Sequence, residues 1–518
     1  MPITVVNMIP KSLSGETNQD SEPNLAVNPN NPMEIVGTAF TPNPSGGSLA
    51  PIFVSADGGH TWTLNPIVPG ATAGFPTGDI TMKFGGTSNV LYGGILRADT
   101  LALNVLRTSN YVSPTPMTVL VSRANEDQPW VQATTATAVS GSPDRVYIGH
   151  NDFNTSPKTA TIERSLSAAS GAAPAGFAPI TIASRTPAGK QNGPSIRPTI
   201  HSSGRLYAAY FNWLSFPAVK ADVVVVRDDN WGSGGTPFTA LTDPGDGLAG
   251  MRVVKSATIP WQNNHFIGQE RVGSHLSIAV DPTNSSIVYL AWCDEPTGAP
   301  PYSIHLRKST DAGVTWSGDL RLIANGINPA VAVNSAGHVG FAYQTLVGGN
   351  SWETHLEISN NGFATAPTSN ILAKVPSATP VATFLPYLGD YIYLMAVGAT
   401  FYGVFSANNT PDNANFPQGV TYQRNANFTT HKLLNVDNVT PVNVSIDPFF
   451  FTATDALTPI NPITILPPVH PIAIQPPIHP IIVPVLTPIH PITIQPPEPI
   501  EPLDPVDPAK APKKNKPE

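Results

Sequence analysis

A strand pattern that recurs along the first 458 residues restricts the fold more than any other feature of the chain. Each unit reads as an apolar strand, a turn rich in Asn, Asp and Gly, and a second apolar strand. Clear copies are residues 25–28 with 35–40, 278–281 with 287–292, and 331–334 with 339–343; weaker copies lie at 80–95, 130–149, 199–210 and 393–405. Seven short β units at regular spacing predict an all-β repeat architecture.

A second motif, S-x-D-x-G-x-T-W, occurs twice in full. Ser and Asp side chains accept backbone N–H bonds inside a turn, Gly adopts a positive φ, and Trp anchors the outgoing strand. Its key residues are Ser55, Asp57, Gly59 and Trp62 in one copy, and Ser309, Asp311, Gly313 and Trp316 in the other. We expect reduced versions near 107–110, 163–165, 226–229, 359–362 and 422–424.

These motifs resemble the Asp boxes of the sialidase, or bacterial neuraminidase repeat, β-propeller superfamily. The resemblance covers roughly residues 20–450, and the Leu-Gly-Asp-Tyr segment at 388–391 looks like a segment common in bacterial sialidase-like repeat proteins. It implies an all-β Asp-box β-propeller. The seven units counted along the chain predict seven blades; six blades are the alternative, because sialidases of this kind have six. The resemblance also implies that the Asp boxes are structural turns on the face away from a ligand site.

Composition excludes several classes of function. The formal net charge is −8 with 12% charged residues, which does not favour a nucleic-acid surface. No apolar run reaches the length of a membrane span. The N-terminus shows no signal-peptide pattern and Cys293 is the single cysteine, so we expect a soluble protein without disulfides. Its location is not encoded; export or display by a non-classical route stays open.

Proline usage predicts three segments. Of the 57 prolines, 19 lie in residues 459–518, which repeat the phrase Pro-Ile-Thr-Ile-Gln-Pro-Pro in variant forms. We therefore divide the chain into an N-terminal segment (1–18), a β-propeller (19–458) and an extended Pro-rich tail (459–518). Because the tail is rich in Ile and Val, it predicts docking on a protein partner or self-association; a simple spacer is the alternative.

Each blade of such a propeller has four strands in chain order. The loop before the first strand and the loop between the second and third strands of every blade therefore lie on the same face of the propeller. These loops combine carboxylates, aromatic rings and arginines, a mixture that suits sugars because rings stack on pyranose C–H surfaces and polar groups bond to hydroxyls. The predicted binding residues are Arg97, Trp130, Arg197, Arg271, Asp390 and Tyr391.

An exo-sialidase-like glycoside hydrolase is the enzymatic alternative that the resemblance implies. It needs three arginines for the substrate carboxylate, an acid/base carboxyl, and a Tyr with a Glu as nucleophile. Arg97, Arg197 and Arg271 supply the arginines, Asp79 or Asp127 the acid/base group, and Tyr391 with Glu270 the nucleophile. The Phe/Tyr-Arg-Ile-Pro segment of that family is absent.

No cofactor or metal is predicted. The chain has no twelve-residue calcium loop and no His-x-x-x-His pair, although its Asn/Asp turns leave Ca²⁺ open. The function predicted first is a glycan-binding or adhesion module. An exo-glycosidase and a structural subunit anchored through the tail are the alternatives.

Overall fold

The computed structural model describes the chain in segments, and the chain divides into two compact units, Met1–Pro459 and Ile460–Glu518. The predictions for the Pro-rich tail lie outside the described residues, as does Glu270. Described are residues 2–40, 47–72, 75, 77–97, 99–135, 143–154, 160–168, 176–185, 193–214, 219–261, 271–296, 302–380 and 387–455.

The described part of the first unit is all-β, with three short 3-10 helices and no α-helix. Six sheets each contain four consecutive antiparallel strands, with the first strand of each at one sheet edge and the fourth at the other. The first two sheets contain β2 (Ser21–Val27), β3 (Ile35–Phe40), β4 (Leu49–Ser55) and β5 (Thr63–Pro69), and β6 (Ile80–Phe84), β7 (Leu91–Arg97), β8 (Ala102–Thr108) and β9 (Thr118–Arg123). The next two contain β10 (Glu126–Thr135), β11 (Asp144–Asp152), β12 (Ala160–Ser165) and β13 (Ala178–Thr181), and β14 (Arg197–Ile200), β15 (Leu206–Trp213), β16 (Lys220–Asp228) and β17 (Met251–Thr258). The last two contain β18 (Leu276–Asp281), β19 (Asn284–Asp294), β20 (Ser303–Ser309) and β21 (Arg321–Ala324), and β22 (Gly326–Val333), β23 (Val339–Val347), β24 (Ser351–Ser359) and β25 (Thr368–Pro376).

A further sheet joins both ends of the described chain. It has the order β26 (Tyr393–Val397), β27 (Thr400–Asn408), β32 (Ile446–Thr454), β1 (Ile3–Asn7) and β28 (Thr421–Tyr422). All five residues of β1 pair antiparallel with β32, from Ile3 opposite Ala453 to Asn7 opposite Phe449. The division of the sequence at residue 18 did not anticipate this pairing, because the partner strand lies at the far end of the folded unit.

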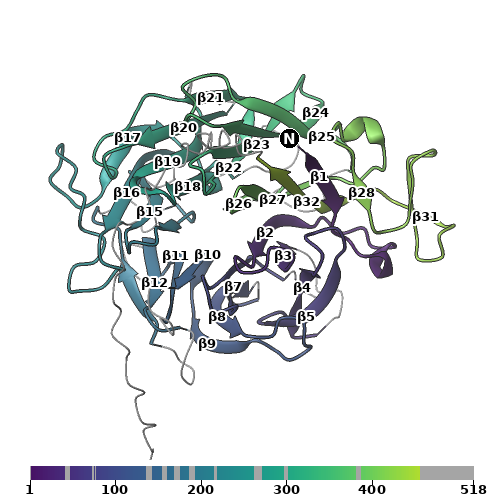
Figure 1. Cartoon of the computed structure of the whole chain (residues 1–518), viewed down its shortest axis with the longest axis horizontal. Helices are drawn as coiled ribbons and strands as arrows, with labels where there is room; N and C mark the ends of the chain where they lie inside the picture. Colours follow the sequence, from purple (N-terminus) through teal and green to yellow (C-terminus); the bar gives the residue numbers. More distant parts are fainter. Residues whose placement is uncertain are drawn as a thin grey trace, which may run out of the picture. The chain divides into compact units, whose positions relative to one another are not determined.

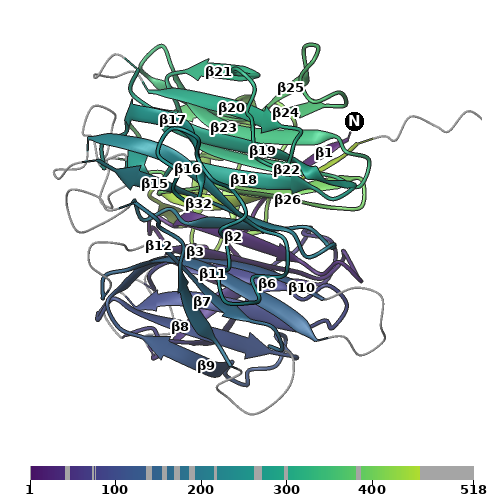
Figure 2. The same cartoon turned by 90° about the vertical axis from the view of Figure 1, so that its left-hand side faces the viewer.

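The first strands meet at a common centre, around which the sheets radiate (Figures 1 and 2). Each first strand contacts the first strand of the next sheet along the chain, and β26 contacts β2. This arrangement of sheets around a central channel is that of a β-propeller.

Packing between sheets follows from the alternation of side chains along each strand. In β16, Val223 and Val225 belong to the apolar core shared with β18 and β19, whereas Val224 and Val226 belong to the core shared with Tyr147 of β11 and Ile162 of β12. Both faces of a sheet are therefore covered, which explains why the strands read as unbroken apolar runs in the sequence.

The two S-x-D-x-G-x-T-W segments form the same turn between the third and fourth strands of their sheets. The Oγ of Ser55 accepts from the N–H of Gly59 (2.9 Å), and Asp57 accepts from both the N–H (2.9 Å) and the hydroxyl (2.7 Å) of Thr61. The same bonds recur at 309–315, and each Trp indole donates to the carbonyl of its motif glycine. These turns lie at the opposite ends of the sheets from the starts of the first strands.

One expected reduced motif is wrong. Residues 422–424 do not connect a third to a fourth strand, because the third strand of the last sheet is β32. They lie in an insertion between β27 and β32 that contains η3 (Asn413–Asn415), β28, and a small sheet of β29 (Ala426–Asn427), β30 (Lys432–Leu434) and β31 (Pro441–Val442). The Arg424 side chain is buried in an ion pair with Asp447, which fixes this segment for another reason.

Candidate functional site

Polar side chains gather where the first strands begin, at one end of the central channel. Three first strands start with a β-bulge, and the bulged residues Glu22, Gln128 and Asn328 have positive φ values of 55°, 45° and 54°. Each of them precedes a proline. Positive φ is costly for residues other than Gly, and such strain is common at functional sites.

Asp390, in the segment before β26, is the hub of this cluster. Its Oδ2 accepts a hydrogen bond from the Gln128 amide (2.7 Å) and forms an ion pair with Arg271 Nη1 (3.1 Å). Its backbone N–H donates to Glu22 Oε1 (3.3 Å). Arg271 directly precedes η2 (Val272–Ser274), so Asp390 connects two first strands, through Glu22 and Gln128, with the segment before β18.

A second contact of the cluster joins Tyr391 to Asp79, next to Glu22. The Tyr391 hydroxyl donates to Asp79 Oδ1 (2.8 Å), and the Glu22 and Asp79 carboxyls lie close enough to influence each other's pKa. Burial, and then the nearby Asp390 charge, raises the pKa of Glu22 well above its usual value and raises that of Asp79 too. Burial also raises the pKa of Tyr391 well above its usual value, so its hydroxyl stays protonated and donates.

Asp127 is the carboxyl of the cluster that is only half-buried. Burial, followed by the charges of Asp79 and Asp390, raises the pKa of Asp127 to about 7, against the opposing charge of Arg271. Protonated and ionised forms of this side chain therefore coexist near neutral pH, which is the condition that favours acid or base work.

Arg197, the first residue of β14, is 1% exposed. Its guanidinium lies 3.9 Å from the ring centre of Trp130, and donates to the side chain of Gln128 (3.1 Å) and the carbonyl of Leu276 (3.3 Å). Burial lowers the pKa of Arg197 to about 10, which still leaves it charged at neutral pH. The Trp130 ring in turn meets the Tyr391 ring edge-on at 5.2 Å, so the two predicted aromatic residues form one wall.

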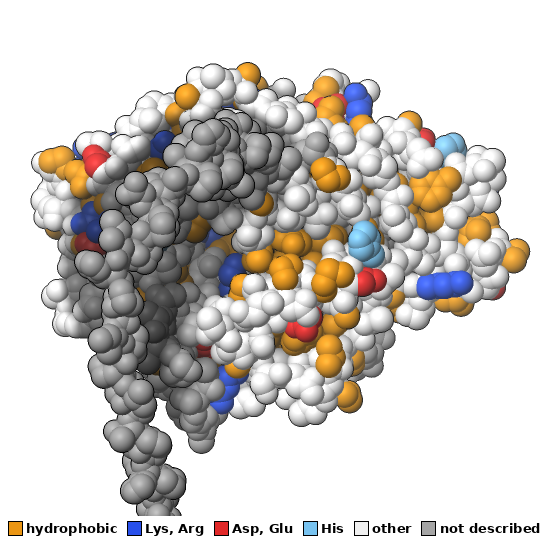
Figure 3. Space-filling view, in the orientation of Figure 1, with side chains coloured by type: hydrophobic (Ala, Val, Ile, Leu, Met, Phe, Trp, Pro, Cys, Tyr) orange, Lys and Arg blue, Asp and Glu red, His pale blue; other side chains and the backbone are white. Residues whose placement is uncertain are grey.

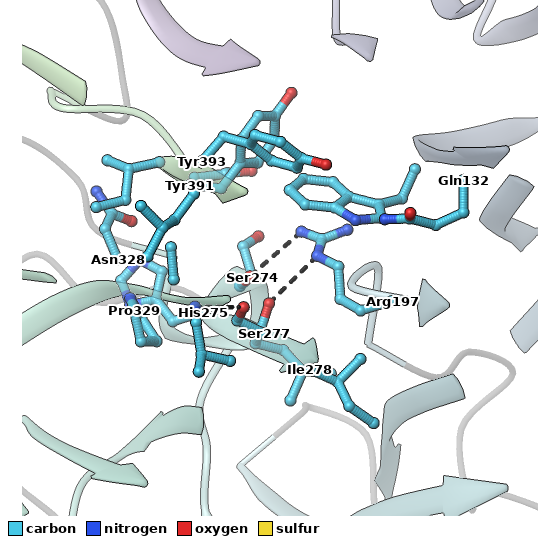
Figure 4. Close-up of a pocket in the computed structure, with 17 residues that line it drawn as sticks. Gln132, Arg197, Ser274, His275, Ser277, Ile278, Asn328, Pro329, Tyr391 and Tyr393 are labelled. Carbon is cyan, nitrogen blue, oxygen red and sulfur yellow. Dashed lines mark hydrogen bonds between the residues drawn. The ribbon is translucent and has the colours of Figure 1, made fainter. Parts of the chain in front are cut away.

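A small cavity lies beside this wall, inside the channel (Figure 4). Its volume is about 40 Å³, room for a few water molecules. Among the described residues, four that line it carry buried polar atoms without a hydrogen-bond partner: Arg197 Nη1, Asp390 Oδ1, Asn328 Oδ1 and both ring nitrogens of His275. Burial, and then the Arg197 charge, lowers the pKa of His275 to about 3, so its ring is neutral.

The structure brings together most of the residues proposed from the sequence. Trp130, Arg197, Arg271, Asp390 and Tyr391 lie in or beside the cluster, with Asp79 and Asp127. Arg97 does not join them: it pairs with Asp99 (3.0 Å) within the loop after β7. Glu270, the proposed partner of Tyr391, lies outside the described residues.

Sequence reasoning missed Glu22, Gln128 and Asn328 as site residues. Their common signal is a polar residue followed by Pro at the start of a first strand, which also occurs at Arg197-Pro198. Proline lacks a donor, so it interrupts the ladder where the bulge turns the preceding side chain toward the centre.

No metal centre emerges from the part of the chain that the structure describes. Within that part, no three His, Cys, Asp or Glu side chains are placed to hold a metal ion, and no helix is long and apolar enough to cross a membrane. On the face drawn in Figure 3, the described Lys and Arg side chains are scattered rather than gathered in one patch.

Comparisons with known proteins find likeness in structure alone. No family model matches the chain, and no curated protein matches it either. Among solved structures it is similar to a xyloglucanase from Xanthomonas campestris (14% identity, 68% of this chain and 47% of that one, TM-score 0.37). It is also similar to an ulvan lyase (11%, 76% and 92%, 0.45) and to the endosialidase of phage phi92 (11%, 88% and 69%, 0.39). The chain spans about half the length of the xyloglucanase, and likeness this distant carries no argument about activity.

Proposed function

We propose that the protein recognises a glycan at the end of the channel where the first strands begin. The observation that carries the proposal is the linked cluster of Glu22, Asp79, Asp127, Asp390 and Arg271 beside the Trp130 and Tyr391 rings. Sugar hydroxyls both donate and accept, and they are bound by carboxyl, amide and guanidinium groups next to aromatic surface.

We further propose that the propeller has seven blades and that its S-x-D-x-G-x-T-W turns are Asp boxes. Support comes from the six four-stranded sheets, with the sheet of β26, β27, β32 and β1 as the seventh blade. In that blade an N-terminal strand lies beside β32, which links the two ends of the ring and leaves less exposed sheet edge.

An exo-glycosidase is the second candidate function, and Asp127 favours it. A carboxyl with a pKa of about 7 is suited to protonate a leaving group. The sialidase type finds less support, because Arg271 is paired with Asp390, Arg197 donates to Gln128 and Leu276, and Arg97 pairs with Asp99. The raised pKa of Tyr391 likewise disfavours it as a nucleophile.

The experiment that tests the proposal is a glycan array probed with the full chain and with Asp390→Asn. Wild type should bind at least one glycan class and the variant should lose most of that signal, because Asp390 holds the cluster together. A fluorogenic glycoside panel, run with Asp127→Asn as control, separates binding from hydrolysis: a hydrolase loses turnover in this variant while it still binds. An array without any binding by the folded protein would refute the proposal.

The Pro-rich tail carries a separate proposal. We propose that residues 459–518 bind a protein partner or a second copy of the chain, on the support of their repeated Ile-rich phrases. In that role the propeller would be a displayed module of a larger assembly.

A further inference from the structure

The charge of the candidate site bears on the kind of sugar it can take. Four carboxyls, of Glu22, Asp79, Asp127 and Asp390, face the guanidinium groups of Arg197 and Arg271. Carboxyl groups therefore outnumber guanidinium groups by four to two at this end of the channel. A third cation, Lys83, lies farther along the channel, where its Nζ donates to the Tyr393 hydroxyl (3.4 Å).

Both arginines lie near several carboxyl groups. Arg271 Nη1 is bonded to Asp390, whereas the described hydrogen-bond partners of the buried Arg197 are neutral, and the charges of Asp79, Asp390 and Asp127 act on it without a direct ion pair. A carboxylate placed beside Arg197 would therefore meet acidic side chains at short range, and repulsion between like charges is strong where water is excluded.

The unpaired atoms around the cavity match a different group. Arg197 Nη1 has hydrogens to donate, whereas Asp390 Oδ1 and Asn328 Oδ1 can only accept, and both residues line the same cavity as Arg197. A hydroxyl accepts from the first and donates its one hydrogen to one of the two oxygens. A carboxylate can only accept, so it would leave the oxygen atoms of Asp390 and Asn328 unsatisfied.

We propose that the site selects a neutral sugar over an acidic one, with one hydroxyl of the ligand entering the cavity between Arg197 and Asp390. This inference rests on the proposed glycan binding and names its ligand class. A cavity of about 40 Å³ takes a hydroxyl or hydroxymethyl group and not a whole ring, so the rest of the sugar lies at the half-exposed end, next to Asp127 and Arg271.

The test uses matched ligands that differ in one group: neutral oligosaccharides of glucose and galactose, and the corresponding oligosaccharides of glucuronate and galacturonate. Binding to the full chain is measured by calorimetry at constant ionic strength. We expect the neutral sugar of each pair to bind at least about tenfold more tightly. The uronate replaces a hydroxymethyl group by a carboxylate, which cannot donate to Asp390 or Asn328 and is repelled by the nearby carboxyl groups.

Two variants locate the effect. In Asp390→Asn the unpaired oxygen loses its charge, so neutral binding should weaken and the preference over the acidic ligand should shrink. Asp127→Asn should shrink the preference as well, and it serves as the second test if Asp390→Asn does not fold. Asp437→Asn, an exposed acid in the distant loop between β30 and β31, is the matched control and should leave both affinities unchanged.

Each outcome has a defined meaning. Equal or tighter binding of the uronate overturns the inference while the glycan proposal stands. An unchanged preference in both site variants also overturns it. Absence of binding to every member of the panel and to the wider array overturns the glycan proposal together with the inference.

Discussion

Two buried charged clusters in this protein differ in how completely the carboxylate at their centre is hydrogen-bonded. In the first, Asp447 of β32 accepts from Arg424, Asn7, Asn409 and Ser445, and both of its oxygens are used. In the second, Asp390 at the channel end leaves Oδ1 unpaired next to a cavity.

The Arg424 cluster joins segments that are far apart in the sequence. Besides Asp447, Arg424 donates to the carbonyls of Ser14 and Glu16, each at 2.8 Å, and so fixes the N-terminal segment and the insertion to the last sheet. The channel cluster instead combines unpaired atoms, positive φ values and a carboxyl that titrates near neutrality. Among the described residues, Arg424 Nε also has no partner, but no cavity lies at Asp447. The comparison teaches that a saturated carboxylate marks a structural charge cluster, whereas several unpaired groups around one cavity mark a candidate site.

The largest effect is expected for the Arg424 cluster, on the free energy of unfolding. Arg424→Met should lower the free energy of unfolding by about 3–5 kcal/mol, because it leaves the buried Asp447 without its charge partner. Urea unfolding followed by tryptophan fluorescence measures it. Arg205→Met, which breaks a more exposed pair with Asp229, is the control and should cost less than about 1 kcal/mol. Equal costs for the two variants would contradict the structural role.

The turns at the far ends of the sheets give a smaller effect. Asp57→Ala or Asp311→Ala should cost roughly 1 to 3 kcal/mol of unfolding free energy, because each carboxylate bonds the N–H and hydroxyl of a Thr within its turn. Glycan affinity should not change, since these turns lie away from the channel end. Loss of glycan binding at an unchanged melting temperature would show that these turns act in ligand binding rather than in stability.

The pH dependence of stability separates the two clusters further. Burial raises the pKa of Asp127 from 3.8 to about 7, so the folded state holds a proton that the unfolded state releases between these values. Unfolding free energy should therefore fall as pH rises from about 4 to about 7 and level off above it as far as this group is concerned. Asp127→Asn should flatten that slope.

Glu16, in the Arg424 cluster, gives the contrasting window. Burial, and then the charges of Asp20 and Asp447, raises the pKa of Glu16 from 4.5 to about 9. The contribution of Glu16 to the unfolding free energy should therefore keep falling up to about pH 9, and Glu16→Gln should reduce the slope that remains above pH 7. Urea unfolding at several pH values from about 5 to about 9 measures both variants. A slope above pH 7 that depends on Asp127 and not on Glu16 would reverse the assignment.

The sequence predicted the local units well because strands, turns and their order are encoded by neighbouring residues. The positions of the strands in the three clear repeat copies could be read directly. The pairing of β1 with β32 could not, because a strand of five residues carries no record of a partner more than 400 positions away.

The site was predictable only in part, for a related reason. Charged and aromatic residues such as Arg197 and Tyr391 stand out in loops, whereas the role of Gln128 depends on a bulge that turns its side chain toward Asp390. The prediction of a turn at 422–424 failed because the buried Arg424 contacts Glu16 and Asp447, which lie in two other segments of the chain. Contacts of this kind have no local pattern.

The smallest expected effect concerns removal of residues 459–518. Every described strand lies before residue 455, and the last sheet takes its further strand from β1, so the truncated chain should unfold at the same urea concentration as the full chain. Glycan affinity should also stay the same, because the channel cluster draws on residues 22 to 391. Light scattering after size-exclusion chromatography then reports the tail's own role: a lower mass for the truncated protein supports self-association, and loss of a captured partner supports docking. A drop in stability on truncation would mean that the tail belongs to the structural side of the comparison, together with the Arg424 cluster.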